Sequence, residues 1–233
     1  MSKYSIGSLL NDLRKRTALT REAMLLFSDI DESSLRRIES GKQEPKPETF
    51  EVLIKSIDFP MESFVYSPLE NYPMEVNLLC DKLTQVLDIG NVGMAENILR
   101  ELKNSAQVDD GIFLQFIMSK EAKLWELQDK PPNEIFPLIE QAMAETFENF
   151  DLRDLDDKVL ILEEPELLHT KARIHAKSGD IDTAINILEK MVSAMLKLPE
   201  ADKDKEKQLT SILMSLSKLL LQREEIRPSH RDM

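Results

Sequence analysis

The chain has 233 residues, enough for one or two domains with hydrophobic cores, and a hydrophobic content of 42% excludes a disordered protein. Only six glycines and few aromatic residues favour an all-α fold. No stretch of eighteen apolar residues and no apolar N-terminal signal region is present, and Cys80 is the single cysteine, so we expect a cytoplasmic protein without an intrachain disulfide or a transmembrane helix.

The net charge of −13 is unevenly distributed along the chain. Residues 1–60 hold 10 Lys and Arg against 10 Asp and Glu, whereas residues 61–233 hold 20 against 33. The acidic second part should repel DNA, so we expect it to meet protein or peptide. A neutral first part can still present a basic face, and dimerisation would double its contacts with phosphates.

The first predicted helix carries Ile6, Leu9, Leu10 and Leu13 on one face and ends in the basic residues 14–16. A helix, a tight turn and a second helix follow between Thr20 and Gly41. Thr20 is a predicted N-cap for residues 21–27, where Ala23, Met24 and Phe27 share a face. Pro47 then opens a further helix through Phe50, Leu53, Ile54 and Ile57.

The second helix of this pair, residues 32–40, has distinct inner and outer faces. Asp31 is its predicted N-cap, and Gly41 ends it because glycine accepts a left-handed conformation without steric cost. Leu35 and Ile38 should point inward. The outward residues are then Glu32, Ser33, Arg36, Arg37 and Ser40. Such a face suits the major groove of DNA, although paired arginines on a helix are often only solvated or ion-paired, here with Glu32 and Glu39.

Residues 5–60 resemble the Xre/Cro-type helix-turn-helix domain of bacterial and phage repressors. The matching segments are LTREAM at 19–24, SLRRIESGK at 34–42, and Pro45 followed by Glu48-Thr49. The resemblance implies base-edge contacts and phosphate contacts from two groups of residues. The first group is Glu32, Ser33, Arg36 and Arg37, and the second is Arg21 and Lys42. Glu32 departs from the neutral donors common in the family: it could accept from a cytosine amino group, or repel the DNA backbone.

The rest of the chain divides into a linker, a helical array and a tail. Pro60, Pro68 and Pro73 mark residues 61–73 as the linker, and residues 225–233 form a polar tail. Between them we predict amphipathic helices at 74–88, 92–106, 110–128, 133–149, 164–178, 181–197 and 205–224. Their short polar connections predict antiparallel neighbours. The last helix has an apolar face that either caps the preceding hairpin or meets a second subunit.

An internal repeat lies within this array. Residues 90–99 align without gaps on residues 179–188, with Gly, Ala, Asn, Ile and Leu coinciding at an offset of 89. Ile139 marks a degenerate middle copy, in which Pro131, Pro132 and Pro137 interrupt the pattern. Residues 167–191 resemble a tetratricopeptide repeat, which predicts an α-solenoid of stacked helical hairpins over residues 74–224.

A helix-turn-helix domain (1–60) followed by such repeats resembles the Rgg/PlcR-like regulators that respond to peptide pheromones in quorum sensing. The resemblance implies a dimeric, sequence-specific transcriptional regulator whose repeats dimerise the protein and bind a short signalling peptide. If the groove exists, Asn77, Asn97 and Asn186 could pair with peptide backbone, although each could equally face solvent. Arg173 could hold a peptide carboxylate, or form an ordinary ion pair.

Catalytic and metal chemistry find no support in the sequence. There is no G-x-S-x-G motif, and Cys80 lies among leucines as an expected core residue. His169 and His175 are not at ligand spacing. We therefore predict no enzyme, no cofactor and no metal. Two alternatives stay open beside peptide control: a DNA-binding regulator controlled by a protein partner, and a scaffold or antagonist that no longer binds DNA.

Overall fold

A computed structural model describes residues 6–16, 19–26, 28–57, 72–104, 111–147, 150–157, 160, 162–196 and 203–226. These residues form eleven α-helices and one 3-10 helix, with no strand among them, which confirms the all-α prediction. None of the described helices is long and apolar enough to cross a membrane. Most of the predicted linker, all of residues 227–233 and Phe27 lie outside the described residues.

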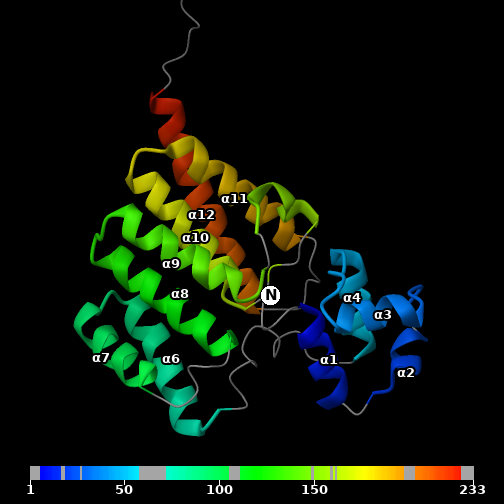
Figure 1. Ribbon diagram of the computed structural model, residues 1–233. Coiled ribbons are helices and arrows are strands. Elements are labelled where there is room, and N and C mark those ends of the chain that lie inside the picture. The colour runs from blue at the N-terminus through cyan, green and yellow to red at the C-terminus, as the bar shows by residue number, and fades with distance from the viewer. Residues whose placement is uncertain are drawn as a thin grey trace, which may run out of the picture.

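The first four helices form a small bundle (Figure 1). They are α1 (Ile6–Arg16), α2 (Arg21–Leu25), α3 (Glu32–Glu39) and α4 (Pro47–Ser56). Their inward apolar side chains make one buried cluster that includes Leu10, Met24, Leu35 and Leu53. Pro47 occupies the first turn of α4, where its missing N–H costs nothing. The helical periodicity of residues 6–57 therefore predicted both the helices and their buried faces.

The remaining helices pack as neighbours in chain order (Figure 1). They are α6 (Met74–Asp88), α7 (Val92–Lys103), α8 (Gly111–Leu127), α9 (Pro132–Ala144), α10 (Glu164–Lys177), α11 (Ile181–Leu196) and α12 (Lys203–Ile226), with the 3-10 helix Leu152–Asp157 before α10. Alternate helices also touch, α6 with α8, α8 with α10 and α10 with α12. Stacked helical hairpins would give these contacts between sequential and alternate helices. That the array is a tetratricopeptide-like solenoid remains a prediction.

Three interhelical turns in the array share one geometry. Gly90, Asp129 and Gly179 each adopt a positive φ, of 71°, 52° and 86°. In each turn the next residue's N–H donates to the carbonyl five positions back, at 2.8 to 3.0 Å. This is the Schellman type of helix end, in which a left-handed residue is favoured. The aligned glycines of the repeat therefore mark real hairpin turns, and Asp129 takes the glycine's place in the middle one.

The observed helix ends differ from the predicted ones mainly at α9, which stops at Ala144 instead of residue 149. Thr146 turns its hydroxyl into the interior, where it accepts from Gln115 Nε2 at 2.7 Å and donates to the buried carboxylate of Glu164. These polar contacts replace a continued helix. They also tie the end of α9 to α8 and α10.

Candidate nucleic-acid interface and ligand cavity

Helices α2 and α3 are both capped as the sequence predicts. The Thr20 hydroxyl accepts from the Ala23 N–H at 3.1 Å, and the Asp31 carboxylate accepts from the Ser34 N–H at 2.9 Å. Hydrogen bonds from Ser33 and Ser34 hold the pKa of Asp31 well below its usual range, so this cap is charged at neutral pH. Gly41 follows α3 with a φ of 69°, which confirms its role in ending the helix.

The two faces of α3 are also as predicted. Leu35 and Ile38 are almost fully buried against the bundle, at 0% and 1% exposure. The five residues expected to face outward are all exposed, namely Glu32, Ser33, Arg36, Arg37 and Ser40. A short capped helix therefore presents a polar surface that no other described element covers.

The cations on this outward face differ in whether they form an ion pair. Arg36 donates from Nη2 and Nε to the same Glu32 oxygen, at 2.7 and 3.1 Å, and both side chains remain largely exposed. Within the described residues no hydrogen bond or ion pair engages the Arg37 guanidinium or the Lys42 ammonium. Arg37 and Lys42 are thus the cations of this face that stay available, while Glu32 holds Arg36 in place.

Glu39 is the residue of α3 that sequence reasoning missed. Its carboxylate is buried, with 3% of the side chain exposed, and it accepts from Arg14 Nε at 2.5 Å and Arg21 Nε at 2.6 Å. Arg21, expected at a DNA phosphate, is therefore engaged within the bundle, with 36% of its side chain exposed. The signal was available: Glu39 is four residues after Leu35 and so shares the inward face.

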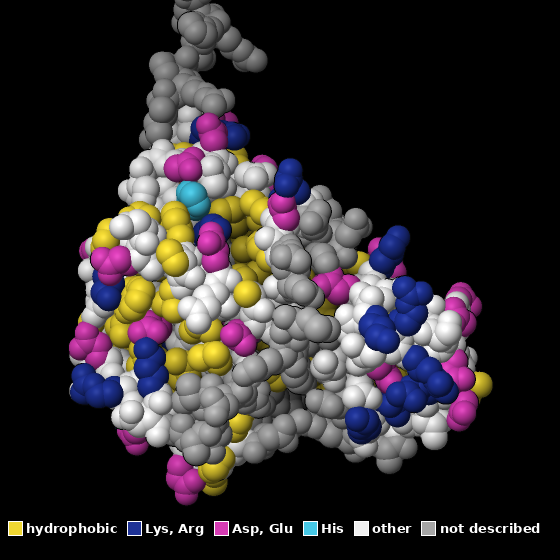
Figure 2. Space-filling model, viewed as in Figure 1, with side chains coloured by type: hydrophobic (Ala, Val, Ile, Leu, Met, Phe, Trp, Pro, Cys, Tyr) yellow, Lys and Arg dark blue, Asp and Glu magenta, His cyan; other side chains and the backbone are white. Residues whose placement is uncertain are grey.

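Gly7 fixes how closely α1 approaches α3. A Cβ at this position would lie 1.6 Å from the Ile38 carbonyl oxygen, so no larger residue fits without a backbone shift. The Arg14–Glu39 contact lies farther along the same pair of helices. Together the two contacts set the position of α3 relative to α1. Figure 2 shows several Lys and Arg side chains on one face of this bundle, with Asp and Glu side chains beside them, whereas the array exposes more apolar surface in the same view.

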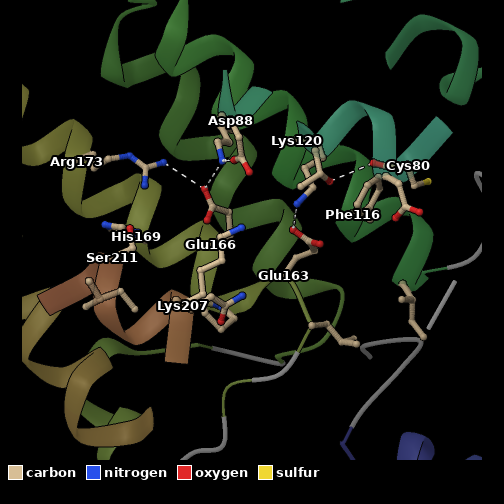
Figure 3. Close-up of a pocket in the computed structure, with 18 of the residues that line it drawn as sticks. Cys80, Asp88, Phe116, Lys120, Glu163, Glu166, His169, Arg173, Lys207 and Ser211 are labelled. Carbon is tan, nitrogen blue, oxygen red and sulfur yellow. Dashed lines mark hydrogen bonds and ion pairs between the residues drawn. The ribbon is translucent and has the colours of Figure 1, made fainter. Parts of the chain in front are cut away.

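A cavity of about 470 Å³ lies in the array between α6, α8, α10 and α12 (Figure 3). Its walls combine apolar side chains with charged ones. The charged and polar residues along it include Asp88, Lys120, Lys123, Glu163, Glu166, His169 and Arg173. The volume is within the range of small-ligand sites. The first helix of each hairpin contributes to it, as does α12.

Most charges in this cavity are already paired with one another. Lys120 Nζ donates to Glu163 at 2.8 Å, and Lys123 contacts both Asp88 at 2.8 Å and Glu166 at 3.4 Å. Burial alone would raise the pKa of Glu166, but the nearby Lys123 and Arg173 outweigh it and lower the pKa to about 2. The cavity therefore offers few unsatisfied charges to a ligand.

Arg173 closes this network on the side of α8. Its guanidinium contacts Glu126 at 2.8 Å and Glu166 at 3.3 Å. Of the two readings that the sequence left open, the structure places Arg173 in ion pairs at the cavity wall (Figure 3). A ligand carboxylate would have to compete with two protein carboxylates for it.

The three candidate asparagines are not brought together. Asn77 lines the cavity; its amide donates to the Tyr72 carbonyl at 3.2 Å, while its buried Oδ1 has no hydrogen-bond partner among the described residues. Asn97 and Asn186 are exposed on α7 and α11, away from the cavity lining. Asn97 and Asn186 occupy equivalent positions of the repeat, whereas Asn77 does not, and the amide chemistry that grouped the three residues does not place them together.

Cys80 is buried, as expected of a core residue, and it also borders the cavity. Burial, reinforced by Asp81, raises the pKa of its thiol to about 12, which keeps it unreactive at neutral pH. Among the described residues, no group of three His, Cys, Asp or Glu side chains is placed to hold a metal ion.

No protein-family model, curated protein or solved structure matches this chain. The candidate interface and the cavity therefore carry the functional argument through their own geometry.

Proposed function

We propose that this chain is a dimeric, sequence-specific DNA-binding transcriptional regulator of the Xre/Cro type, whose helical array binds a short signalling peptide. The observation that carries the proposal is the capped helix α3, which exposes Glu32, Ser33, Arg36 and Arg37 on the surface of the bundle. In helix-turn-helix proteins the N-terminal part of the second helix contacts base edges in the major groove. Arginine is suited to guanine there, because it donates to O6 and N7 together.

The modest charge of one bundle supports dimerisation. Arg14 and Arg21 are engaged by Glu39, which lowers the charge free for phosphates, and phosphate contacts supply most of the binding free energy that does not depend on sequence. Helix α12 offers an apolar surface for a second copy: Leu213, Met214 and Leu221 are 42%, 70% and 64% exposed. A homodimer through α12 would present two copies of α3 to an inverted repeat.

Peptide binding is proposed for the cavity between α6, α8, α10 and α12. The buried Oδ1 of Asn77 has no hydrogen-bond partner among the described residues, so a shift of this side chain toward the cavity would let it accept from a peptide N–H, and apolar side chains nearby suit an uncharged peptide. Asn97 and Asn186 remain candidates only for a second contact region, since both lie away from this cavity.

Selection of random duplex DNA by the purified full-length protein tests the proposal. We expect enrichment of an inverted repeat, and loss of that enrichment in the Arg36→Ala/Arg37→Ala variant. Lys55→Ala is a matched control, because Lys55 is an exposed cation of the same bundle that pairs with Glu51 on α4. Equal loss in the control would mean that general charge, not α3, is responsible.

The alternative of a scaffold that no longer binds DNA rests on the zero net charge of residues 1–60. Absence of any enriched sequence at low salt, where phosphate contacts are strongest, would contradict DNA binding and favour this alternative. Control by a protein partner instead of a peptide would appear as DNA binding without any rise in melting temperature on addition of short apolar peptides.

A further inference from the structure

Two apolar residues of the array take part both in the cavity and in the core of the helix-turn-helix bundle. Ile112, at the start of α8, and Leu162, just before α10, line the cavity. Both are also part of the buried apolar cluster of the helix-turn-helix bundle, each with 8% of its surface exposed. The cavity and the bundle therefore share a wall, and a molecule filling the cavity would contact residues whose other side packs within the bundle's cluster.

Leu162 is the more constrained of the two. Its backbone has a φ of 55°, in the left-handed region that side chains other than glycine's rarely adopt. Such a conformation persists only when the surroundings impose it. The side chain of Leu162 is buried and belongs to the apolar cluster of the bundle.

The next residue anchors this point to the array. Glu163 accepts from Ser119 Oγ at 2.7 Å and from Lys120 Nζ at 2.8 Å, both on α8. Lys120 and Glu163 line the cavity as well. Of these two consecutive residues, Leu162 belongs to the apolar cluster of the bundle, whereas Glu163 is bound to α8 at the cavity wall (Figure 3).

We propose that Leu162, together with Ile112, couples occupancy of the cavity to the placement of the helix-turn-helix bundle. A ligand shifts a conformational equilibrium only when it binds one arrangement better than another. A shared wall offers a route to such a preference, because moving Leu162 would change the cavity and the bundle's apolar cluster together. The inference rests on the proposed function for its consequence, altered DNA binding, but the coupling itself is independent of DNA.

The test uses the full-length protein with the cavity filled by substitution, so that no ligand needs to be known. Thr84→Phe places a ring into the cavity from α6, at a half-buried position outside the bundle's apolar cluster. Spin labels on Gln43→Cys and Glu189→Cys, both exposed, report the distance between bundle and array. Buried Cys80, with its raised pKa, stays unlabelled.

We expect Thr84→Phe to shift the distance distribution and Leu162→Ala to remove at least half of that shift. Ile212→Ala is the matched control: Ile212 also lines the cavity and is 1% exposed, but it packs in the array's own apolar cluster. Coupling predicts that the distance shifts caused by Thr84→Phe and Leu162→Ala do not add, whereas those caused by Thr84→Phe and Ile212→Ala do.

An unchanged distance distribution in Thr84→Phe, or an equal shift with and without Leu162→Ala, would overturn the coupling. If Thr84→Phe fails to fold, Gln208→Phe places a ring at a half-buried position of the same cavity on α12 and is judged by the same comparison. The distances are measured without DNA. Failure to enrich any DNA sequence would therefore contradict the proposed function alone, and unchanged distances would contradict the coupling alone.

Discussion

Replacing Glu39 by Gln should destabilise the helix-turn-helix bundle more than any comparable change on its surface. The substitution keeps the shape of the side chain and removes its charge. Arg14, with 10% of its side chain exposed, would then be a buried cation without its main counter-charge. Removal of one partner from a buried ion pair typically costs about 3–5 kcal/mol, because the other charge stays buried.

The structure places this case at the lower end of that range. Arg14 would keep its hydrogen bonds to the Leu19 carbonyl at 3.0 Å and to Asn11 Oδ1 at 3.2 Å. Arg21 is partly exposed and can be solvated again. We therefore expect a loss of about 3 kcal/mol for Glu39→Gln. For Arg21→Ala we expect about 1 kcal/mol, as for a pair that water reaches.

Native-state amide hydrogen exchange of α1 and α3 measures this loss within the bundle, where a global unfolding curve of a long chain would mix several transitions. Glu51→Gln is the matched control, since it removes the same charge from the exposed Glu51–Lys55 pair on α4 and should cost less than about 1 kcal/mol. The reasoning is refuted if Glu39→Gln protects α3 as well as the control does.

Two further predictions concern the packing of α1 and the pH dependence of the array. Gly7→Ala should destabilise the bundle by about 3 kcal/mol in the same exchange experiment, because the new Cβ would lie 1.6 Å from the Ile38 carbonyl oxygen. Gly93→Ala is the control: no atom lies near its Cβ position, so this substitution should not destabilise α7. Burial and the nearby Arg173 lower the pKa of His169 to about 4 in the folded chain. Between this pKa and the ordinary pKa of histidine, only the unfolded chain protonates the imidazole. The free energy of unfolding should therefore fall as the pH falls through this range. Urea unfolding followed by Trp125 fluorescence should show about 2 kcal/mol lost between pH 7 and pH 5, and a clearly smaller loss in His169→Gln; an unchanged pH profile in the variant would contradict the assignment.

Local signals explain why so much of the fold could be predicted. The caps at Thr20 and Asp31, the helix end at Gly41 and the burial of Leu35 depend on neighbours within a few residues, and all appear as expected. The hairpin turn at Gly90 recurs at Gly179 because the same positive-φ backbone geometry favours glycine, although Asp129 adopts it in the middle turn. Such features are set by spacing, which a sequence displays directly.

Contacts between segments far apart in the sequence could not be predicted from the spacing of residues. Glu39 was read as a partner for the exposed arginines, yet Arg14, 25 residues away in the chain, binds it in the interior. The amides of Asn97 and Asn186 suit a peptide backbone, but they lie on α7 and α11, whereas the cavity is lined by α6, α8, α10 and α12. Leu162 carried no signal at all, because neither its backbone conformation nor its double contact follows from neighbouring residues.

The distribution of charge in the bundle connects these findings. Residues 1–60 are neutral overall, and the structure commits Arg14 and Arg21 to Glu39 and pairs Arg36 with Glu32. A single bundle therefore has part of its positive charge neutralised internally, and its binding to DNA alone should be weak. Under the proposed function, affinity would then depend on two bundles meeting two half-sites together, which makes it sensitive to their spacing. A wall that sets the placement of the bundle, as proposed for Leu162, would consequently regulate DNA binding without touching the DNA-facing residues.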